Sequence, residues 1–429
     1  MRWTIPEQPD LLEQGGGRPP RRWPVVVVAV VAVLALVGYG VVRQAQRRPP
    51  SASDAVSSLS ASPPSTAPSG PNGLPMTTGA CGAQASRMFM NADPVDERTG
   101  VRLLVGGAQV ALVDVDSGQV VPRSQVPDAD HNQAQTLVRH GADVYALVAP
   151  CEGPRPGRVV GVDAKGEVRR VPMSGPVDGL IGGPAGVYGV DYPPDDATPG
   201  AGSAVQLRPV GGGTVSVDGD LSPLGVTSAG VVALANGEHA DGEPPQVVLL
   251  DRSTGHVTRT IAGGYPLGVS GDAVIWHGKA CRYLATGPAA RCVLHATDVG
   301  GADRSYRLPT GRTPASDVVA SADGRFVALQ ISDSRTDSRY TGGHPGPPSE
   351  LAVLDLGSGR LRIVPGLELP PKAGAGLAFT PDDRWLAATV SEGDHGHLLL
   401  WRVGTARALR TDVRLAGPLA SAPPVVALR

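Results

Sequence analysis

The chain has 429 residues, and 41% of them are apolar, so it is long enough to bury a large core. Its formal net charge of -2 lacks the basic excess that nucleic-acid binding requires, and we expect no nucleic-acid partner. The 57 Gly and 42 Pro residues are spread along the chain, which favours many short strands joined by turns over long helices.

The first predicted element is a transmembrane helix over residues 24–42. This range contains an uncharged run of eighteen residues, almost all Val, Ala, Leu or Gly, which is long enough to span a membrane. Trp23 and Tyr39 lie near its ends, where aromatic rings prefer the membrane interface. A cleaved secretory signal is the alternative, but Arg43 stands where a small cleavage-site residue should be. We therefore expect an uncleaved signal-anchor, with residues 1–23 as a short cytoplasmic tail.

The next segment, residues 43–80, is predicted to be a disordered linker. It is rich in Pro, Ser, Ala and Thr and has few large apolar residues, so it cannot offset the entropy lost on ordering. Arginines flank the predicted helix in similar number on both sides and do not decide its orientation. The body after the linker carries all four Cys, which favours an extracytoplasmic body on a single-pass protein of the cell membrane.

One pattern recurs seven times after residue 81: an apolar strand reaches a short turn of Asp, Gly or Ser, and an alternating strand follows. The turn positions lie 42 to 58 residues apart, at Gly118, Gly166, Gly213, Gly255, Gly301, Gly359 and Ala406. Another short apolar strand precedes six of these hairpins, so each repeat has at least three strands. Four-stranded units at this period are typical of propeller blades. We therefore predict an all-β fold in which residues 81–429 form one seven-bladed β-propeller; two β-sandwiches in tandem are the alternative.

Two of the repeats carry a recognisable motif. Residues 321–328 and 380–387 resemble the Ser-Pro-Asp-Gly-Arg signature of WD40-like and TolB-like bacterial propeller repeats. This resemblance implies the propeller fold, with the motif as a turn and its Arg covering the blade edge. The family includes binders, scaffolds and a few enzymes, so the resemblance implies little about function.

The predicted connections between the second and third strands are long. We expect them to gather on one face of the propeller, where loops held by a rigid scaffold usually carry binding residues. Neutral insertions are the alternative. The connections are 150–157, 191–203, 236–245, 277–291, 332–350 and 391–396.

The four Cys predict two disulfides. Cys281 and Cys292 lie at the two ends of one long connection, where a disulfide would close a small ring. That leaves Cys81, at the start of the body, to pair with Cys151 in the second blade. Four Cys allow three pairings, and free thiols are the alternative. No C-x-x-C spacing indicates zinc binding or redox exchange.

Motifs for catalysis, cofactors or metals are sparse. Residues 114–118 begin like a calcium loop, but the same Asp-to-Gly spacing recurs at 251–255 and 355–359 and predicts a turn. Residues 392–397 gather Glu, Asp and His in one loop, which is more often a solvated loop than a metal site. The sequence contains no G-x-S-x-G or H-E-x-x-H. We predict no catalytic residue, no cofactor and no metal site.

Two expectations concern strand placement. Pro122 and Pro209 should lie at blade edges or turns, because proline cannot donate to a central ladder. Blade one is short of a strand on its amino-terminal side, and residues 415–429 resemble the opening of a further repeat. We expect this tail to pair with the strands around 101–115 and close the ring.

For function we favour a non-enzymatic binding module, tethered to the membrane, for an extracytoplasmic protein, peptide or glycan. The alternative is a propeller hydrolase or lyase acting on cell-envelope polymer at the mouth of the central channel. Clustered carboxylates, or a set of Arg, Tyr and His at that mouth, would favour the enzyme, and an apolar or aromatic surface patch would favour the binder.

Overall fold

The computed structural model describes part of the chain, namely residues 89–92, 95, 97–107, 109–127, 132–150, 156–173, 175–193, 204–217, 219–235, 243–282, 291–315, 318–333, 349–369, 375–392, 395–415 and 424–428. All of them belong to one compact unit, Thr66–Arg429. The predicted tail (1–23), membrane helix (24–42) and linker (43–80) lie outside the described residues. Within the described ranges, no helix is both long and apolar enough to cross a membrane.

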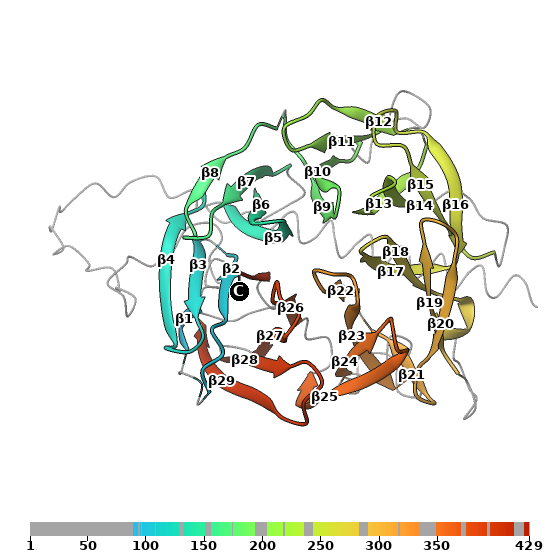
Figure 1. Cartoon of the computed structure of the whole chain (residues 1–429). Helices are drawn as coiled ribbons and strands as arrows, with labels where there is room; N and C mark the ends of the chain where they lie inside the picture. The colour runs from blue at the N-terminus through green and yellow to red at the C-terminus, as the bar shows by residue number, and fades with distance from the viewer. Residues whose placement is uncertain are drawn as a thin grey trace, which may run out of the picture. The chain divides into compact units, whose positions relative to one another are not determined.

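Seven antiparallel sheets stand as blades around a common centre, as Figure 1 shows, so the predicted all-β seven-bladed propeller is confirmed. Blades two to five are four-stranded meanders. Blade two contains β5 (Asn132–His140), β6 (Asp143–Pro150), β7 (Arg158–Val162) and β8 (Val168–Arg170). Blade three contains β9 (Gly179–Gly183), β10 (Gly186–Asp191), β11 (Val205–Pro209) and β12 (Val215–Val217). Blade four contains β13 (Leu221–Val226), β14 (Val231–Ala235), β15 (Gln246–Leu250) and β16 (Val257–Gly263). Blade five contains β17 (Tyr265–Ser270), β18 (Ala273–His277), helix α3 (Lys279–Arg282), β19 (Val293–Asp298) and β20 (Asp303–Arg307).

The other three blades depart from this plan. In blade six, two short strands pair with the same neighbour; the strands are β21 (Arg312–Pro314), β22 (Val319–Ala320), β23 (Phe326–Asp333), β24 (Ser349–Asp355) and β25 (Arg360–Leu369). Blade seven gains an extra outer strand; it contains β26 (Ala375–Phe379), β27 (Trp385–Glu392), β28 (His395–Arg402), β29 (Ala408–Leu415) and β1 (Phe89–Ala92). Blade one takes its inner strand from the chain end; it contains β30 (Val425–Ala427), β2 (Arg102–Val105), β3 (Gln109–Asp114) and β4 (Gln119–Gln125).

The ring closes at both ends of the described chain. β30 pairs with β2, with Val425 opposite Val105 and Ala427 opposite Leu103, so the predicted closure by the tail is confirmed. The sequence analysis missed β1, which pairs with β29 at the outer edge of blade seven. One end of the chain therefore completes blade one from inside, and the other extends blade seven from outside.

The hydrophobic core lies between neighbouring blades, because side chains alternate between the two faces of a strand. In β24, Ala352 and Leu354 pack toward blade five, whereas Leu351 and Val353 pack toward blade seven. β30 behaves in the same way, since its side chains join the core on both sides of blade one.

The prolines lie where their missing N–H does least harm. Pro122 lies on the outermost strand of blade one, and Pro209 ends β11 beyond the pairing with β12, so both expectations are confirmed. Pro223 and Pro266 lie on the innermost strands of their blades, directly beside register shifts.

Each turn between the third and fourth strands contains a glycine with positive φ, at Gly118, Gly166, Gly211, Gly255, Gly301, Gly359 and Gly404. The predicted turn positions Gly213 and Ala406 do lie in their turns, but the residues with positive φ there are Gly211 and Gly404. In blade seven the reason is steric, because a Cβ disfavours the left-handed conformation and the turn uses Gly404 in place of Ala406.

Deletion of residues 425–429 should destabilise the whole propeller. The deletion removes three buried side chains and leaves the inner edge of β2 unpaired, which costs on the order of 4 kcal/mol. We expect the thermal midpoint of the full-length protein to fall by roughly 5 °C or more. Deletion of residues 7–11, from the predicted tail, is the matched control and should leave it unchanged. An equal midpoint for both deletions would contradict closure by β30.

Candidate functional site

An aspartate follows the third strand in five blades and organises the next turn. The carboxylates accept hydrogen bonds from backbone N–H groups two to four residues later; they belong to Asp114, Asp163, Asp251, Asp298 and Asp355. These turns include 114–118, 251–255 and 355–359, so the predicted turns are confirmed. Of these five aspartates, Asp355 also forms an ion pair with an arginine.

That arginine is Arg325, and the motif at residues 321–328 positions it. The Ser321 hydroxyl accepts from the N–H of Phe326 and donates to Asp323, which accepts from the N–H of Arg325. These bonds fold the motif into a tight turn directly before β23, as predicted from the resemblance. Its Arg does not cover the blade edge as expected, because Asp355 draws its guanidinium along the end of blade six.

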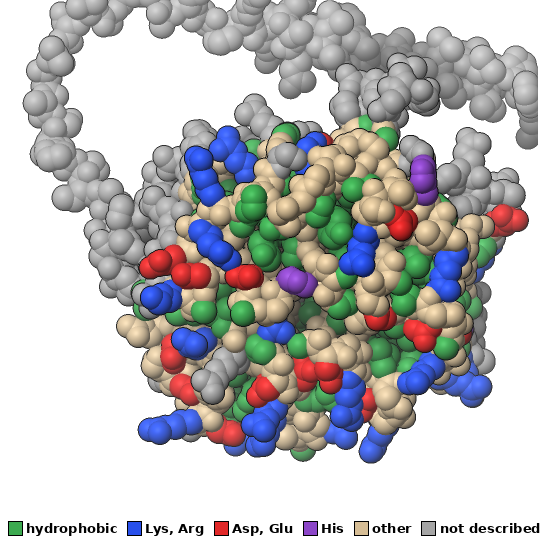
Figure 2. Space-filling model, turned by 45° about the horizontal axis from the view of Figure 1, so that its top comes forward, with side chains coloured by type: hydrophobic (Ala, Val, Ile, Leu, Met, Phe, Trp, Pro, Cys, Tyr) green, Lys and Arg blue, Asp and Glu red, His purple; other side chains and the backbone are tan. Residues whose placement is uncertain are grey.

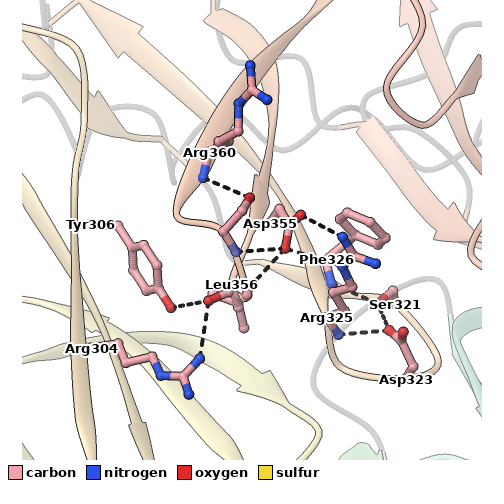
Figure 3. A network of polar contacts seen from close by, with 11 residues as sticks. Arg304, Tyr306, Ser321, Asp323, Arg325, Phe326, Asp355, Leu356 and Arg360 are labelled. Atoms are coloured by element: carbon pink, nitrogen blue, oxygen red, sulfur yellow. Dashed lines mark hydrogen bonds and ion pairs between the residues drawn. The ribbon is translucent and has the colours of Figure 1, made fainter.

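Arg325 and Asp355 form a two-point ion pair (Figure 3). Nη2 of Arg325 lies 2.9 Å from Oδ2 of Asp355, and Nε lies 3.3 Å from Oδ1. The guanidinium also lies over the ring of Phe326, 4.8 Å from its centroid. Asp355 is thus bonded both to its own turn and to the arginine, which fixes all three groups.

A pocket of about 350 Å³ opens beside this pair, between blades six and seven. Three arginines line it, Arg325, Arg360 and Arg362, together with a single acidic residue, Asp355. Apolar side chains complete the wall, from Phe326, Val353, Trp401 and Val403. The pocket is therefore a cationic site with an apolar floor.

Strand alternation places two of these arginines together. Arg360 and Arg362 are two residues apart at the start of β25, so their side chains share one face. Nη1 of Arg362 donates to the carbonyl of Gly404 in blade seven, at 2.6 Å. Figure 3 shows the Arg360 side chain extending away from the other labelled groups, and no acceptor among the described residues bonds its guanidinium.

The charged groups of the ion pair titrate far from neutrality. The hydrogen bond from Arg325, together with backbone N–H bonds from its own turn, lowers the pKa of Asp355 to about 2. The same hydrogen bond and the charge of Asp355 raise the pKa of Arg325. Both groups stay charged at any physiological pH, so they hold a fixed electrostatic pattern and do not exchange protons.

Blade seven repeats the motif without the pair. Residues 380–387 fold like residues 321–328, since the Thr380 hydroxyl donates to Asp382 and accepts from the N–H of Trp385. The strand-end position that Asp355 fills in blade six is Arg402 in blade seven, and the guanidinium of Arg384 instead contacts Asp382 of its own turn, at 3.7 Å. The site is therefore particular to blade six, although its motif is not.

A second group of polar contacts links the inner turns, those between the first and second strands. Nδ1 of His140 donates to the carbonyl of Gly183 in the next blade, at 3.0 Å. Between blades four and five, Ser228 donates two hydrogen bonds to the carboxylate of Asp272, of 2.7 and 2.6 Å. Because the first strands lie innermost, these contacts run around one end of the propeller centre (Figure 1).

Asp383 belongs to this group and carries backbone strain. It is the one described residue other than glycine with positive φ, at 55°, where blade six has Gly324. Its carboxylate accepts from the N–H groups of Ala322 and Asp323 in blade six. Burial, and then the neighbouring carboxyl of Asp323, raise the pKa of Asp383. The charge of Asp383 also acts on Arg139 of blade two, whose pKa is lowered by burial.

The sequence-predicted candidates have mixed outcomes. The Cys281–Cys292 disulfide is confirmed, with the Cα atoms 4.7 Å apart. Cys81 and Cys151 lie outside the described residues, so their pairing stays a prediction. Most residues of the other long connections also lie outside them, and in the sheet order these connections join second to third strands. The long connection predicted at 391–396 is wrong, because β27 continues to Glu392 and β28 begins at His395. The pocket lies at the opposite end of the blades, among the tight turns.

No metal site is found among the described residues, where no three His, Cys, Asp or Glu side chains gather closely enough to hold an ion. The loop predicted at 392–397 is wrong, because residue 392 ends β27 and residues 395–397 begin β28. In β28, Nε2 of His397 is contacted by Nη2 of Arg410. An apolar surface patch is also not found in the same ranges, because the exposed large apolar residues Tyr192, Val257 and Ile363 lie on three different blades. Figure 2 shows charges of both signs interspersed over one face.

Sequence reasoning missed the pocket residues. The alternation Arg360-Leu361-Arg362 after a turn glycine was a usable signal, because it places two cations on one face of an outer strand. The sequence could not show that the turn of blade seven approaches blade six and brings Trp401 and Gly404 to the pocket.

Comparison with known proteins finds distant likenesses to solved structures. No family model matches the chain, and no curated protein matches it. TolB from Acinetobacter baumannii is 17% identical, with a TM-score of 0.36 over 75% of this chain and 78% of that one. An oligogalacturonate lyase in complex with manganese is 14% identical, with a TM-score of 0.45 over 74% of this chain and 86% of that one. A prolyl endopeptidase is 13% identical, with a TM-score of 0.47; the match covers 78% of this chain and 51% of that one.

Asp355→Asn should lower the free energy of unfolding by about 1 kcal/mol near pH 7, because the ion pair is partly exposed. The pKa of Asp355 is depressed in the folded state, so its stabilisation is present above about pH 4 and is lost as the pH falls toward 2. Denaturant unfolding at pH 7, 4 and 2.5 should show the difference from wild type shrinking in acid. Arg325→Gln should behave similarly. A difference that does not change with pH would contradict this role for the ion pair.

Proposed function

We propose that the chain is a membrane-tethered protein whose propeller acts outside the cytoplasm as a non-enzymatic module for binding a protein or another ligand. The observation that carries this proposal is the pocket between blades six and seven. Guanidiniums with a fixed charge and a carboxylate with a pKa of about 2 can recognise a ligand, but they are poor general acids and bases near neutral pH.

The disulfide supports the extracytoplasmic placement. Disulfides persist in oxidising compartments and are rare in the cytosol. Cys281 and Cys292 are both buried against the core that blades five and six share, so the bond is part of the packed structure. The uncharged run at residues 24–42 would provide the tether, and residues 43–80 would hold the propeller away from the membrane surface.

The alternative is a hydrolase or lyase acting on cell-envelope polymer, and the inner turns are what favour it. Asp323, Asp383 and Arg139 bring two carboxyls and a partly buried cation to one end of the propeller centre, and paired carboxyls can divide acid and base roles. However, each carboxyl already accepts backbone N–H groups from the turns of blade six. These hydrogen bonds favour a structural role for the two carboxyls in joining neighbouring blades, so we rank the enzymatic function second.

The membrane topology can be tested by cysteine labelling of intact cells. With Ser60→Cys in the linker, a membrane-impermeant maleimide should label the protein without lysis. With Gln8→Cys in the tail, labelling should require lysis, and the unsubstituted protein corrects for native cysteines. Labelling of Gln8→Cys in intact cells, with Ser60→Cys protected, would overturn the extracytoplasmic placement.

The binding function can be tested by crosslinking the tagged full-length protein in its own membranes. A bound partner should be recovered with wild type and reduced several-fold with the double variant Arg360→Gln and Arg362→Gln. Arg384→Gln, at the motif position of blade seven, is the control and should leave recovery unchanged. Turnover of an envelope polymer by the purified protein, abolished by Asp383→Asn, would contradict the proposal and favour the enzyme.

A further inference from the structure

The pocket between blades six and seven has more hydrogen-bond donors than its own residues use. Each guanidinium carries five N–H donors. Arg325 directs Nε and Nη2 at Asp355, and Arg362 directs Nη1 at the carbonyl of Gly404. Arg360 has no side-chain partner among the described residues. The site therefore presents a fork of free donors that carry positive charge.

The main acceptors of the pocket already take part in hydrogen bonds of the protein. Oδ1 of Asp355 accepts from Nε of Arg325 and from the N–H groups of Gly357 and Ser358, and Oδ2 accepts from Nη2 of Arg325. The carbonyl of Gly404 is held by Arg362. A ligand rich in hydroxyl donors would find few partners here, whereas an anionic acceptor would find several.

The floor of the pocket limits the body of the ligand. Phe326 and Val403 present carbon surface, with Val353 and Trp401 buried behind them. The volume of about 350 Å³ is near the lower end for a small-molecule site. The pocket therefore accommodates one residue-sized group with an apolar body. A sugar acid, with hydroxyls around its ring, fits this floor and the scarcity of acceptors poorly.

We propose that this pocket binds a carboxylate attached to an apolar body, as presented by the carboxyl-terminal residue of a peptide with an apolar side chain. The planar carboxylate matches the guanidinium fork of Arg360, and the side chain lies on the partly exposed Phe326 and Val403. An acidic side chain within a peptide is a second source of the same group. This inference rests on the proposed binding function and names its ligand.

The three arginines have different roles in this site. Arg360 contacts the carboxylate. Arg325 and Arg362 are positioning residues, because their partners in blades six and seven fix the pocket wall and its charge. The ion pair with Asp355 holds Arg325 against Phe326, so the pocket is preorganised before a ligand arrives.

Small probes test the chemistry without knowledge of the natural partner. The full-length protein in detergent micelles is titrated with N-acetylphenylalanine, with its carboxamide, with galacturonate and with an amidated peptide that contains one internal glutamate. We expect N-acetylphenylalanine to bind at least tenfold more tightly than its carboxamide and than galacturonate. Its affinity should weaken as salt is raised, because the site is open to solvent.

Arg360→Gln is the decisive variant, since Arg360 is exposed and holds no structural contact of its side chain among the described residues. It should weaken binding of N-acetylphenylalanine at least tenfold without changing the thermal midpoint. Arg384→Gln, which removes an exposed arginine from the blade-seven motif, should leave the affinity unchanged. Comparison of the two variants separates a contact at this pocket from a general loss of positive charge.

Each outcome decides the question. Equal affinity for the acid and its carboxamide, tighter binding of galacturonate, or an unchanged affinity in Arg360→Gln would overturn the inference. Binding of the glutamate peptide that depends on Arg360 would uphold the carboxylate and assign it to an acidic side chain. If the probes do not bind but crosslinking still recovers a partner, this inference fails and the proposed binding function stands.

Discussion

The first and last blades must meet without a peptide bond between them, and the remaining structure depends on how this junction is held. Two strands hold it here. β30 supplies the inner strand of blade one, and β1 extends the outer edge of blade seven. Val425, Val426 and Ala427 are buried on both sides of blade one, so its packing against blades two and seven depends on the chain end. Two strand edges that would otherwise be open are paired as a result.

Because the ring is closed, neighbouring blades are held at a fixed distance from each other. The candidate site depends on this spacing, since residues of two blades form it. Arg325, Asp355, Arg360 and Arg362 belong to blade six, but Arg362 is held by the turn of blade seven and Trp401 forms part of the floor. The pocket exists because two neighbouring turns differ: blade six has Asp355 where blade seven has Arg402. A small sequence difference between repeats thus becomes a local site on a regular scaffold.

Among the described residues, the groups suited to ligand binding and the groups suited to acid–base catalysis lie in different places. In the pocket, the pKa of Asp355 is lowered and that of Arg325 is raised, so the charges of this ion pair are constant. The inner turns hold the carboxyl with a raised pKa, Asp383, but in a strained backbone conformation and bonded to the neighbouring blade. Strain of this kind persists only where the surroundings impose it, and here the contact between blades six and seven is sufficient reason.

The sequence by itself determined the repeat, the fold class and the closure by the tail, because strand alternation and turn glycines are local signals with a period of one blade. It also determined the Cys281–Cys292 pair, since the two residues lie at the two ends of one connection between neighbouring strands. Only the tertiary structure decided that β1 joins blade seven and that Arg360, Arg362 and Trp401 share a pocket. Those contacts join segments from different repeats, and their geometry depends on how closely two blades pack, which no local pattern encodes.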